Sequence, residues 1–174
     1  TVVNLNDIKL STTYFLNVFT HSRDSALTTK FSDHFIEFLS KSEENNRYDE
    51  IMEIFTEKTN DIFEAILHAD SAVAKSIQDI LSTILEHSTV EKCRAFASNM
   101  IQYIPSVISN WRCIHKFLEI LMIYCNRDVE FIQKENIAQK LFVTIKSVLE
   151  NTKSSVYLKN VNFSSFFVFV NDHI

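Results

Sequence analysis

The chain of 174 residues contains no glycine and only one proline. An average sequence of this length would carry roughly a dozen glycines. Phosphate-binding P-loops, dinucleotide-binding Rossmann turns, kinase glycine-rich loops and nucleophile elbows all need glycine, because their backbones turn left-handed or approach a ligand closely. These classes of site are therefore excluded, and tight two-residue hairpins lose their preferred residues. The composition favours an all-helical domain.

Basic residues are too few and too scattered for general nucleic-acid binding. Lys and Arg total 17 against 22 Asp and Glu, which gives a formal net charge of −5, and phosphate binding depends on clustered basic residues. No apolar run approaches the roughly 18 residues of a membrane-spanning helix, and the N-terminal residues lack the order of a signal peptide. We expect a cytoplasmic protein, with the nucleus as the alternative, that binds neither nucleic acid nor membrane.

The sequence offers no recognisable metal, cofactor or catalytic site. The three cysteines, Cys93, Cys113 and Cys125, lie too far apart for a zinc site, and no two histidines have the three- or four-residue spacing of helical metal ligands. We expect three buried, reduced thiols. Because no pattern places a nucleophile beside a base, we predict that the protein is not an enzyme and holds no cofactor or metal.

Apolar residues recur every three or four positions along most of the chain, which predicts α-helices. The pattern gives eight of them, with a break near Asn136 in the seventh and a Phe-rich run in the eighth that could form a strand by propensity. The sixth is expected to follow Pro105, because proline stops one helix and starts another. The predicted ranges are 6–20, 25–41, 47–67, 71–86, 89–103, 106–125, 128–150 and 154 to the C-terminus.

The same periodicity predicts which side chains form the core. In the first two helices the inward stripes are Ile8, Phe15, Val18 and Phe19, then Phe31, Phe35, Phe38 and Leu39. In the third and fourth they are Ile51, Ile54, Phe55, Ile62, Phe63 and Ile66, then Val73, Ile77, Ile80, Leu81, Ile84 and Leu85.

Predicted helix pairs start near residues 6, 47, 89 and 128, a period of about 40 residues that is typical of HEAT and armadillo units. Each such pair leaves one face unburied until its neighbour stacks on it. We therefore predict an all-α, armadillo/HEAT-like right-handed α-solenoid of about four helix pairs. Residues 1–174 would form a single helical-repeat domain or a fragment of a longer array. A compact helical bundle explains the same periodicity and stays open as the alternative.

Trp111, Arg112 and Lys116 form the candidate binding site. Arg112 and Lys116 are four residues apart and share one helix face beside Trp111. In a solenoid the second helix of a unit often lines the concave surface, and two cations beside an aromatic ring suit an acidic peptide or a C-terminal carboxylate. The alternative is an ordinary solvated pair of charges.

From about residue 61 onward, several stretches resemble the calcium-binding protein 39 family, armadillo-like scaffolds that bind and activate certain kinases and pseudokinases. The family's Arg-x-x-x-Lys on a concave helix, which helps to hold a partner's C-terminal peptide, is similar to Arg112 and Lys116. The resemblance implies kinase scaffolding without calcium chemistry, since the chain has no EF-hand loop. Glu119 and Ile120 stand where the family usually has glycine, and the first 60 residues match poorly. The matching stretches are Ala72–His87, Arg112–Leu121, Asn126–Asp128, Phe131–Asn136, Ser155–Leu158 and Phe167–Val170.

Two further resemblances give alternative functions. Phe117–Leu149 is similar to regulatory subunit 3 of protein phosphatase 4, and Asn110-Trp111-Arg112 resembles the Asn-Trp-Gly-Arg turn of Bcl-2-like regulators without its glycine. Our prediction is a non-catalytic protein-binding scaffold or adaptor that grips a partner peptide or domain on its concave face, with a kinase or pseudokinase as the partner implied by the resemblance. The alternatives are an armadillo-type phosphatase regulatory subunit and a compact Bcl-2-like bundle that regulates cell death.

Overall fold

The computed structural model describes residues 5–43, 47–68, 71–107, 111–134, 136–137, 139–143 and 146. These residues form α-helices joined by short connections, and they contain no strand, so the all-α prediction is confirmed for them. The chain divides into two compact units, Thr1–Phe96 and Ala97–Ile174. The predicted helix from residue 154 and the Phe-rich run within it lie outside the described residues.

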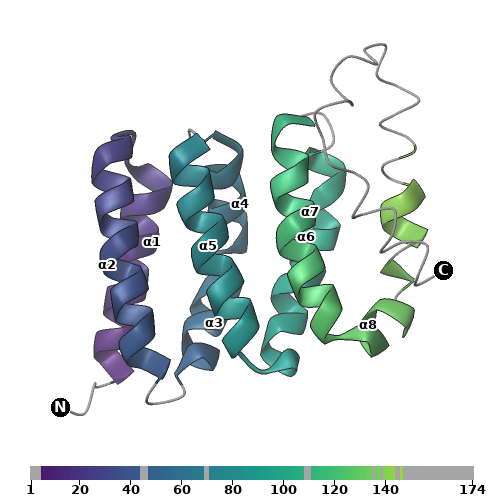
Figure 1. Cartoon of the computed structure of the whole chain (residues 1–174), viewed down its shortest axis with the longest axis horizontal. Helices are drawn as coiled ribbons and strands as arrows, with labels where there is room; N and C mark the ends of the chain where they lie inside the picture. Colours follow the sequence, from purple (N-terminus) through teal and green to yellow (C-terminus); the bar gives the residue numbers. More distant parts are fainter. Residues whose placement is uncertain are drawn as a thin grey trace. The chain divides into compact units, whose positions relative to one another are not determined.

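The first unit contains two helical hairpins (Figure 1). The first hairpin is α1 (Leu5–His21) with α2 (Ser25–Glu43), and the second is α3 (Tyr48–Glu57) and α4 (Thr59–His68) with α5 (Ser71–His87). α1 packs on α2, α3 and α4, while α2 packs chiefly on α5. The first arms of the two hairpins therefore lie together, and so do the second arms.

The predicted helix 47–67 is wrong in one respect, because the structure divides it at Lys58 into α3 and α4. Lys58 has φ −104° and ψ 18°, outside the α-helical region. The hydroxyl of Thr59 donates to the carbonyl oxygen of Thr56 at 2.6 Å, and the Thr56 hydroxyl donates to that of Met52 at 2.8 Å. Hydrogen bonds of this kind bend helices, and they need neither glycine nor proline to do so.

The prediction that Pro105 separates two helices is also wrong. α6 (Val90–Val107) runs through this residue, and α7 (Trp111–Arg127) begins later than expected. The fixed φ of proline is itself helical, so the chain can continue for two more residues after losing one N–H donor. The predicted break near Asn136 is confirmed, because α8 (Val129–Lys134) ends before it and Asn136 adopts a φ of 50°.

The core of the first unit is apolar and rich in aromatic rings. Phe15 and Phe35 stack with ring centroids 4.1 Å apart, and Phe63 meets the ring of Phe96 edge-on at 5.6 Å. The predicted stripes of the third and fourth helices are fully confirmed as buried, and each such side chain contributes roughly 1.5–3 kcal/mol. Three side chains predicted to be inward are only half-buried, because they lie at the edges of their stripes. These are Val18, Phe31 and Phe38.

Within the first unit, the start of α3 is tied to the start of α6. The Asp49 carboxylate accepts hydrogen bonds from the Thr89 backbone N–H at 2.6 Å and from the Thr89 hydroxyl at 3.0 Å. Glu53 pairs with Lys92, and this hydrogen-bonded ion pair raises the pKa of Lys92. The partners in these two pairs are 40 and 39 residues apart, which matches the predicted repeat period.

In the second unit, α7 and α8 pack together around buried side chains that include Phe117, Leu121 and Tyr124. Cys93 of the first unit and Cys125 of the second are buried thiols outside any disulfide, as predicted. The side chain of Cys113 lies outside the described residues.

Candidate functional site

The structure places the three predicted binding residues at the start of α7. Trp111 is the first residue of that helix, with Arg112 next and Lys116 one turn further on. Because both residues lie within α7, Arg112 and Lys116 are about one helical turn apart. Their side chains, and that of Trp111, lie outside the described residues. Their role in partner binding stays a prediction.

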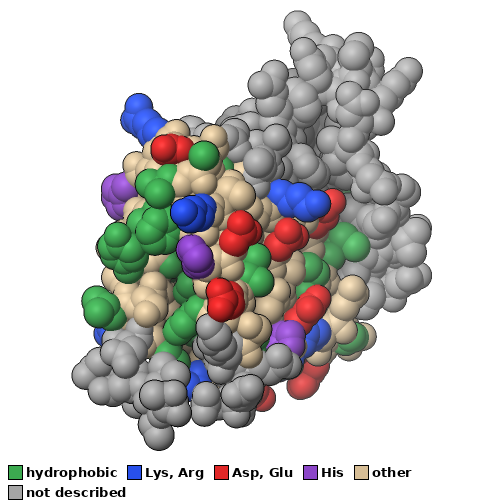
Figure 2. Space-filling model, turned by 60° about the vertical axis from the view of Figure 1, so that its left-hand side comes forward, with side chains coloured by type: hydrophobic (Ala, Val, Ile, Leu, Met, Phe, Trp, Pro, Cys, Tyr) green, Lys and Arg blue, Asp and Glu red, His purple; other side chains and the backbone are tan. Residues whose placement is uncertain are grey.

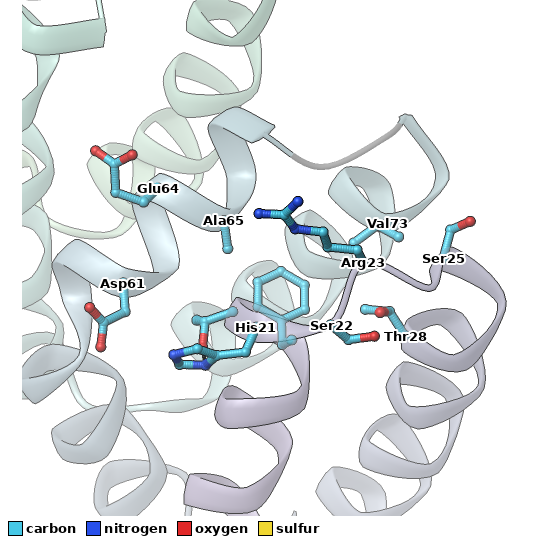
Figure 3. A pocket seen from close by; sticks show the side chains of 11 residues that line it. His21, Ser22, Arg23, Ser25, Thr28, Asp61, Glu64, Ala65 and Val73 are labelled. Atoms are coloured by element: carbon cyan, nitrogen blue, oxygen red, sulfur yellow. Dashed lines mark hydrogen bonds between the residues drawn. The ribbon is translucent and has the colours of Figure 1, made fainter.

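A cleft with a volume of about 800 Å³ lies in the first unit where α1 turns into α2 (Figure 3). One wall comes from the end of α1 and the loop after it, with His21, Ser22 and Arg23. Asp61 and Glu64 project from α4, and Ser25, Thr28 and Val73 complete the lining from α2 and α5. The cleft thus combines basic, acidic and hydroxyl side chains.

A hydroxyl–imidazole contact lies at the end of α1 beside the cleft. The Thr20 hydroxyl lies 2.8 Å from Nδ1 of His21, and it donates to the Leu16 carbonyl oxygen at 2.8 Å. Nδ1 of His21 also lies 3.1 Å from the Asn17 carbonyl oxygen. Both side chains thus lie within hydrogen-bond distance of backbone carbonyl oxygens of their own helix, one turn earlier.

Charges on the two walls of the cleft are unevenly compensated. Asp61 forms a long ion pair with Lys58 at 4.0 Å. Arg23 is exposed and has no hydrogen bond or ion pair with any part of the chain that the structure describes. In Figure 3 its guanidinium extends toward the α4 side of the cleft. The cleft can accept a polar or charged group of a partner at Arg23.

The second candidate site is an exposed apolar surface on the first hairpin, which we call the α1–α2 strip. The side chains of Leu10, Tyr14 and Leu27 are 70%, 58% and 43% exposed. The half-buried ring of Phe31 joins the two helices, since its centroid lies 5.8 Å from that of Tyr14. The α1–α2 strip consists of Leu10, Tyr14, Leu27 and Phe31.

Helix geometry explains why the α1–α2 strip is separate from the core. Leu10 and Tyr14 are one turn apart on α1, and Leu27 and Phe31 are one turn apart on α2, so each pair forms a short ridge. The buried stripe of α1 lies on its other side. That stripe consists of Ile8, Thr12, Phe15, Leu16 and Phe19. The α1–α2 strip is therefore an outward-facing apolar surface, the kind that marks interaction sites.

Sequence reasoning missed the α1–α2 strip, although it left a signal. Leu10 and Tyr14 are large apolar residues that fall outside the inward stripe of their helix. Phe31 was assigned to the inward stripe of its helix, and the structure places its half-buried ring against Tyr14. An apolar residue out of phase with its own helix is thus the pattern that would have identified this surface.

Comparison with known proteins finds no matching family model, no matching curated protein and no matching solved structure. Among the described side chains, no three of His, Cys, Asp and Glu come together as metal ligands would. None of the described helices has both the length and the apolar character needed to cross a membrane.

Proposed function

We propose that the protein is a non-catalytic protein-binding scaffold or adaptor and that the α1–α2 strip is one of its binding surfaces. The observation that carries this proposal is the exposure of Leu10 and Tyr14 beside Leu27 and Phe31. Large exposed apolar side chains that gather on one surface, here around the Tyr14–Phe31 ring contact, mark surfaces that a partner covers.

The size of the α1–α2 strip sets the strength of binding that it can supply. Covering the exposed parts of Leu10, Tyr14 and Leu27 would contribute on the order of 3–5 kcal/mol before the entropic cost of association is subtracted. That amount is too small for tight binding by itself. The partner must therefore add polar or charged contacts around these side chains.

The order of helix packing supports the solenoid as the architecture that presents this surface. In an up-and-down four-helix bundle, consecutive helices are neighbours and the last packs on the first. In the first unit α1 packs on α3 and α4, and α2 packs on α5. This is the order expected when successive hairpins stack. We propose that such stacking continues along the chain as a right-handed armadillo/HEAT-like array.

The finer prediction places a kinase or pseudokinase on a concave face that contains Trp111, Arg112 and Lys116. It rests on the family resemblance and on the spacing of these residues. It assigns these residues contacts with a partner peptide or domain. The phosphatase-subunit and Bcl-2-like alternatives rest on shorter stretches of sequence.

The test compares partner capture by three forms of the chain. The double variant Leu10→Ser/Tyr14→Ser removes the α1 half of the α1–α2 strip, and Ile36→Ser is the matched control, because Ile36 is 41% exposed on another side of α2. Circular dichroism should show all three folded, since exposed substitutions typically change stability by only about 0.5 kcal/mol. We expect quantitative mass spectrometry to find proteins held by the wild type and the control but lost from the double variant. An identical set of captured proteins for all three forms would refute the proposal.

A further inference from the structure

We infer that the partner segment that covers the α1–α2 strip is an acidic amphipathic helix. The inference rests on the proposed function and adds the chemistry and shape of the partner. It follows from two features of the first hairpin, namely the basic side chains beside its apolar residues and the spacing of the apolar residues themselves.

Uncompensated basic groups lie along α2 beside the α1–α2 strip. Lys30 and His34 follow Leu27 at three and seven residues, so they share its side of the helix with Phe31. Both are exposed, and neither forms a hydrogen bond or ion pair with the part of the chain that the structure describes. Lys30 offers positive charge, and both side chains offer hydrogen-bond donors to a partner.

Nearby acidic groups do not pair with these two side chains. Asp24 lies before α2, where its carboxylate accepts the Leu27 backbone N–H at 3.1 Å and caps the helix. Asp33 and Glu37 each lie three residues after one of the two basic residues, but neither Lys30 nor His34 forms an ion pair with the described part of the chain. Figure 2, which brings this side of the molecule forward, shows hydrophobic side chains gathered there with Lys, Arg and His side chains and also Asp and Glu side chains nearby. Acidic groups on the partner would complement Lys30 and His34, which lack an ion pair with the described chain.

The spacing of the apolar residues favours a helix as the bound segment. Leu10 with Tyr14, and Leu27 with Phe31, form two ridges of four-residue spacing on neighbouring helices. Ridges of this spacing fit the grooves of a third helix. Helix-in-groove recognition uses apolar anchors at i, i+3, i+4 and i+7 on one face of the partner. The opposite, polar face stays in water, and the acidic groups at its border reach Lys30 and His34.

Three synthetic peptides of equal length test the inference. Each carries the same Leu and Phe anchors at i, i+3, i+4 and i+7, and the remaining positions are Glu, Gln or Lys mixed with Ala, which gives an acidic, a neutral and a basic helix. Fluorescence anisotropy measures their binding to the full chain at low and at physiological salt. We expect the acidic peptide to bind about tenfold more tightly than the basic one, with a smaller difference at higher salt. Lys30→Glu/His34→Glu should remove this preference, whereas Leu10→Ser/Tyr14→Ser should weaken binding of all three peptides.

The outcomes separate this inference from the proposed function. Equal binding of the three peptides, or tightest binding of the basic one, overturns the acidic partner while leaving the α1–α2 strip as a binding surface. If the acidic peptide binds the wild type and Leu10→Ser/Tyr14→Ser equally well, the inference is overturned for this surface. If light scattering shows a dimer that the same double variant converts to a monomer, a second copy of the chain is the occupant and the inference is overturned as well. Failure of every peptide to bind overturns the helical partner, and the capture experiment then decides the proposed function separately.

Discussion

Asp128 should carry a measurable share of the stability of the second unit. Its side chain is buried, with 4% exposure, and its carboxylate accepts hydrogen bonds from a side chain of α7 and from the backbone of α8. The Tyr124 hydroxyl donates at 2.5 Å, and the Phe131 backbone N–H donates at 3.3 Å. The second bond caps the start of α8. The first satisfies a phenol that is itself only 1% exposed.

The expected effects follow from what each variant leaves unpaired. Asp128→Ala removes the helix cap, at a cost of about 1 kcal/mol. It also removes the carboxylate acceptor of the buried Tyr124 hydroxyl, at a cost of about 1–3 kcal/mol. The free energy of unfolding should therefore fall by about 2–4 kcal/mol. Asp128→Asn keeps an amide oxygen for the cap and a polar group beside the phenol, so it should lose about 1 kcal/mol. Tyr124→Phe takes one donor from the buried Asp128 carboxylate, which keeps the Phe131 N–H, and should lose about 1–3 kcal/mol.

Urea unfolding followed by tryptophan fluorescence measures these differences. The single tryptophan of the chain, Trp111, lies on α7 and therefore reports on the unit that contains α8. Gln133→Ala is the control, because Gln133 is an exposed residue of the same short helix and its loss should change stability by at most about 0.5 kcal/mol. The reasoning fails if Asp128→Ala loses no more stability than Asp128→Asn, or if both behave like the control.

Two further predictions concern α7. Burial, helped by the nearby Asp128 carboxylate, raises the pKa of the Cys125 thiol to about 12. The thiol of the unfolded chain loses its proton at lower pH than the buried thiol does. The free energy of unfolding should therefore fall by about 1.4 kcal/mol per pH unit between about pH 9 and 12. Cys125→Val should lack this pH-dependent loss of stability, and equal pH slopes for the two proteins would contradict the prediction. Arg112→Glu/Lys116→Glu should weaken binding of an acidic peptide with a free C-terminal carboxylate by about tenfold in fluorescence anisotropy, with a melting temperature only a few degrees lower. Unchanged affinity would remove Arg112 and Lys116 from the binding site.

Helix ranges could be predicted where the apolar stripe is long and its ends coincide with the ends of the helix. Ranges 25–41 and 71–86 lie within two residues of α2 and α5, because the stripes of these helices are long and strictly periodic. The break at Lys58 could not be found this way, since the stripe continues through it and the break coincides with hydroxyl-to-carbonyl hydrogen bonds of Thr56 and Thr59. Periodicity reports burial, and it does not detect a change in hydrogen bonding along a helix that remains buried on one side.

The residues of the candidate site could be predicted from the sequence less completely than the helices. A search for charged pairs beside aromatic residues selected Trp111, Arg112 and Lys116, because charge and aromatic character are visible in a single stretch. The α1–α2 strip combines residues of two helices, and Tyr14 meets Phe31 only after the hairpin closes. A one-dimensional pattern can show that Leu10 and Tyr14 are out of phase with their own core. Which helix lies beside them depends on tertiary packing.

The α1–α2 strip is also where the physics of stacked hairpins leads us to expect a partner. Within the described part of the first unit, α1 and α2 pack on the second hairpin, and the second hairpin is tied onward to α6 through Asp49 and Thr89. A stacked hairpin that keeps an apolar outer side gains stability when another surface covers it, because burial of apolar faces is what stabilises such units. Leu10 and Tyr14 keep that side apolar. Substituting them with serine should therefore leave the fold intact and remove binding, whereas a loss of stability in the same variant would mean that these side chains serve the fold itself.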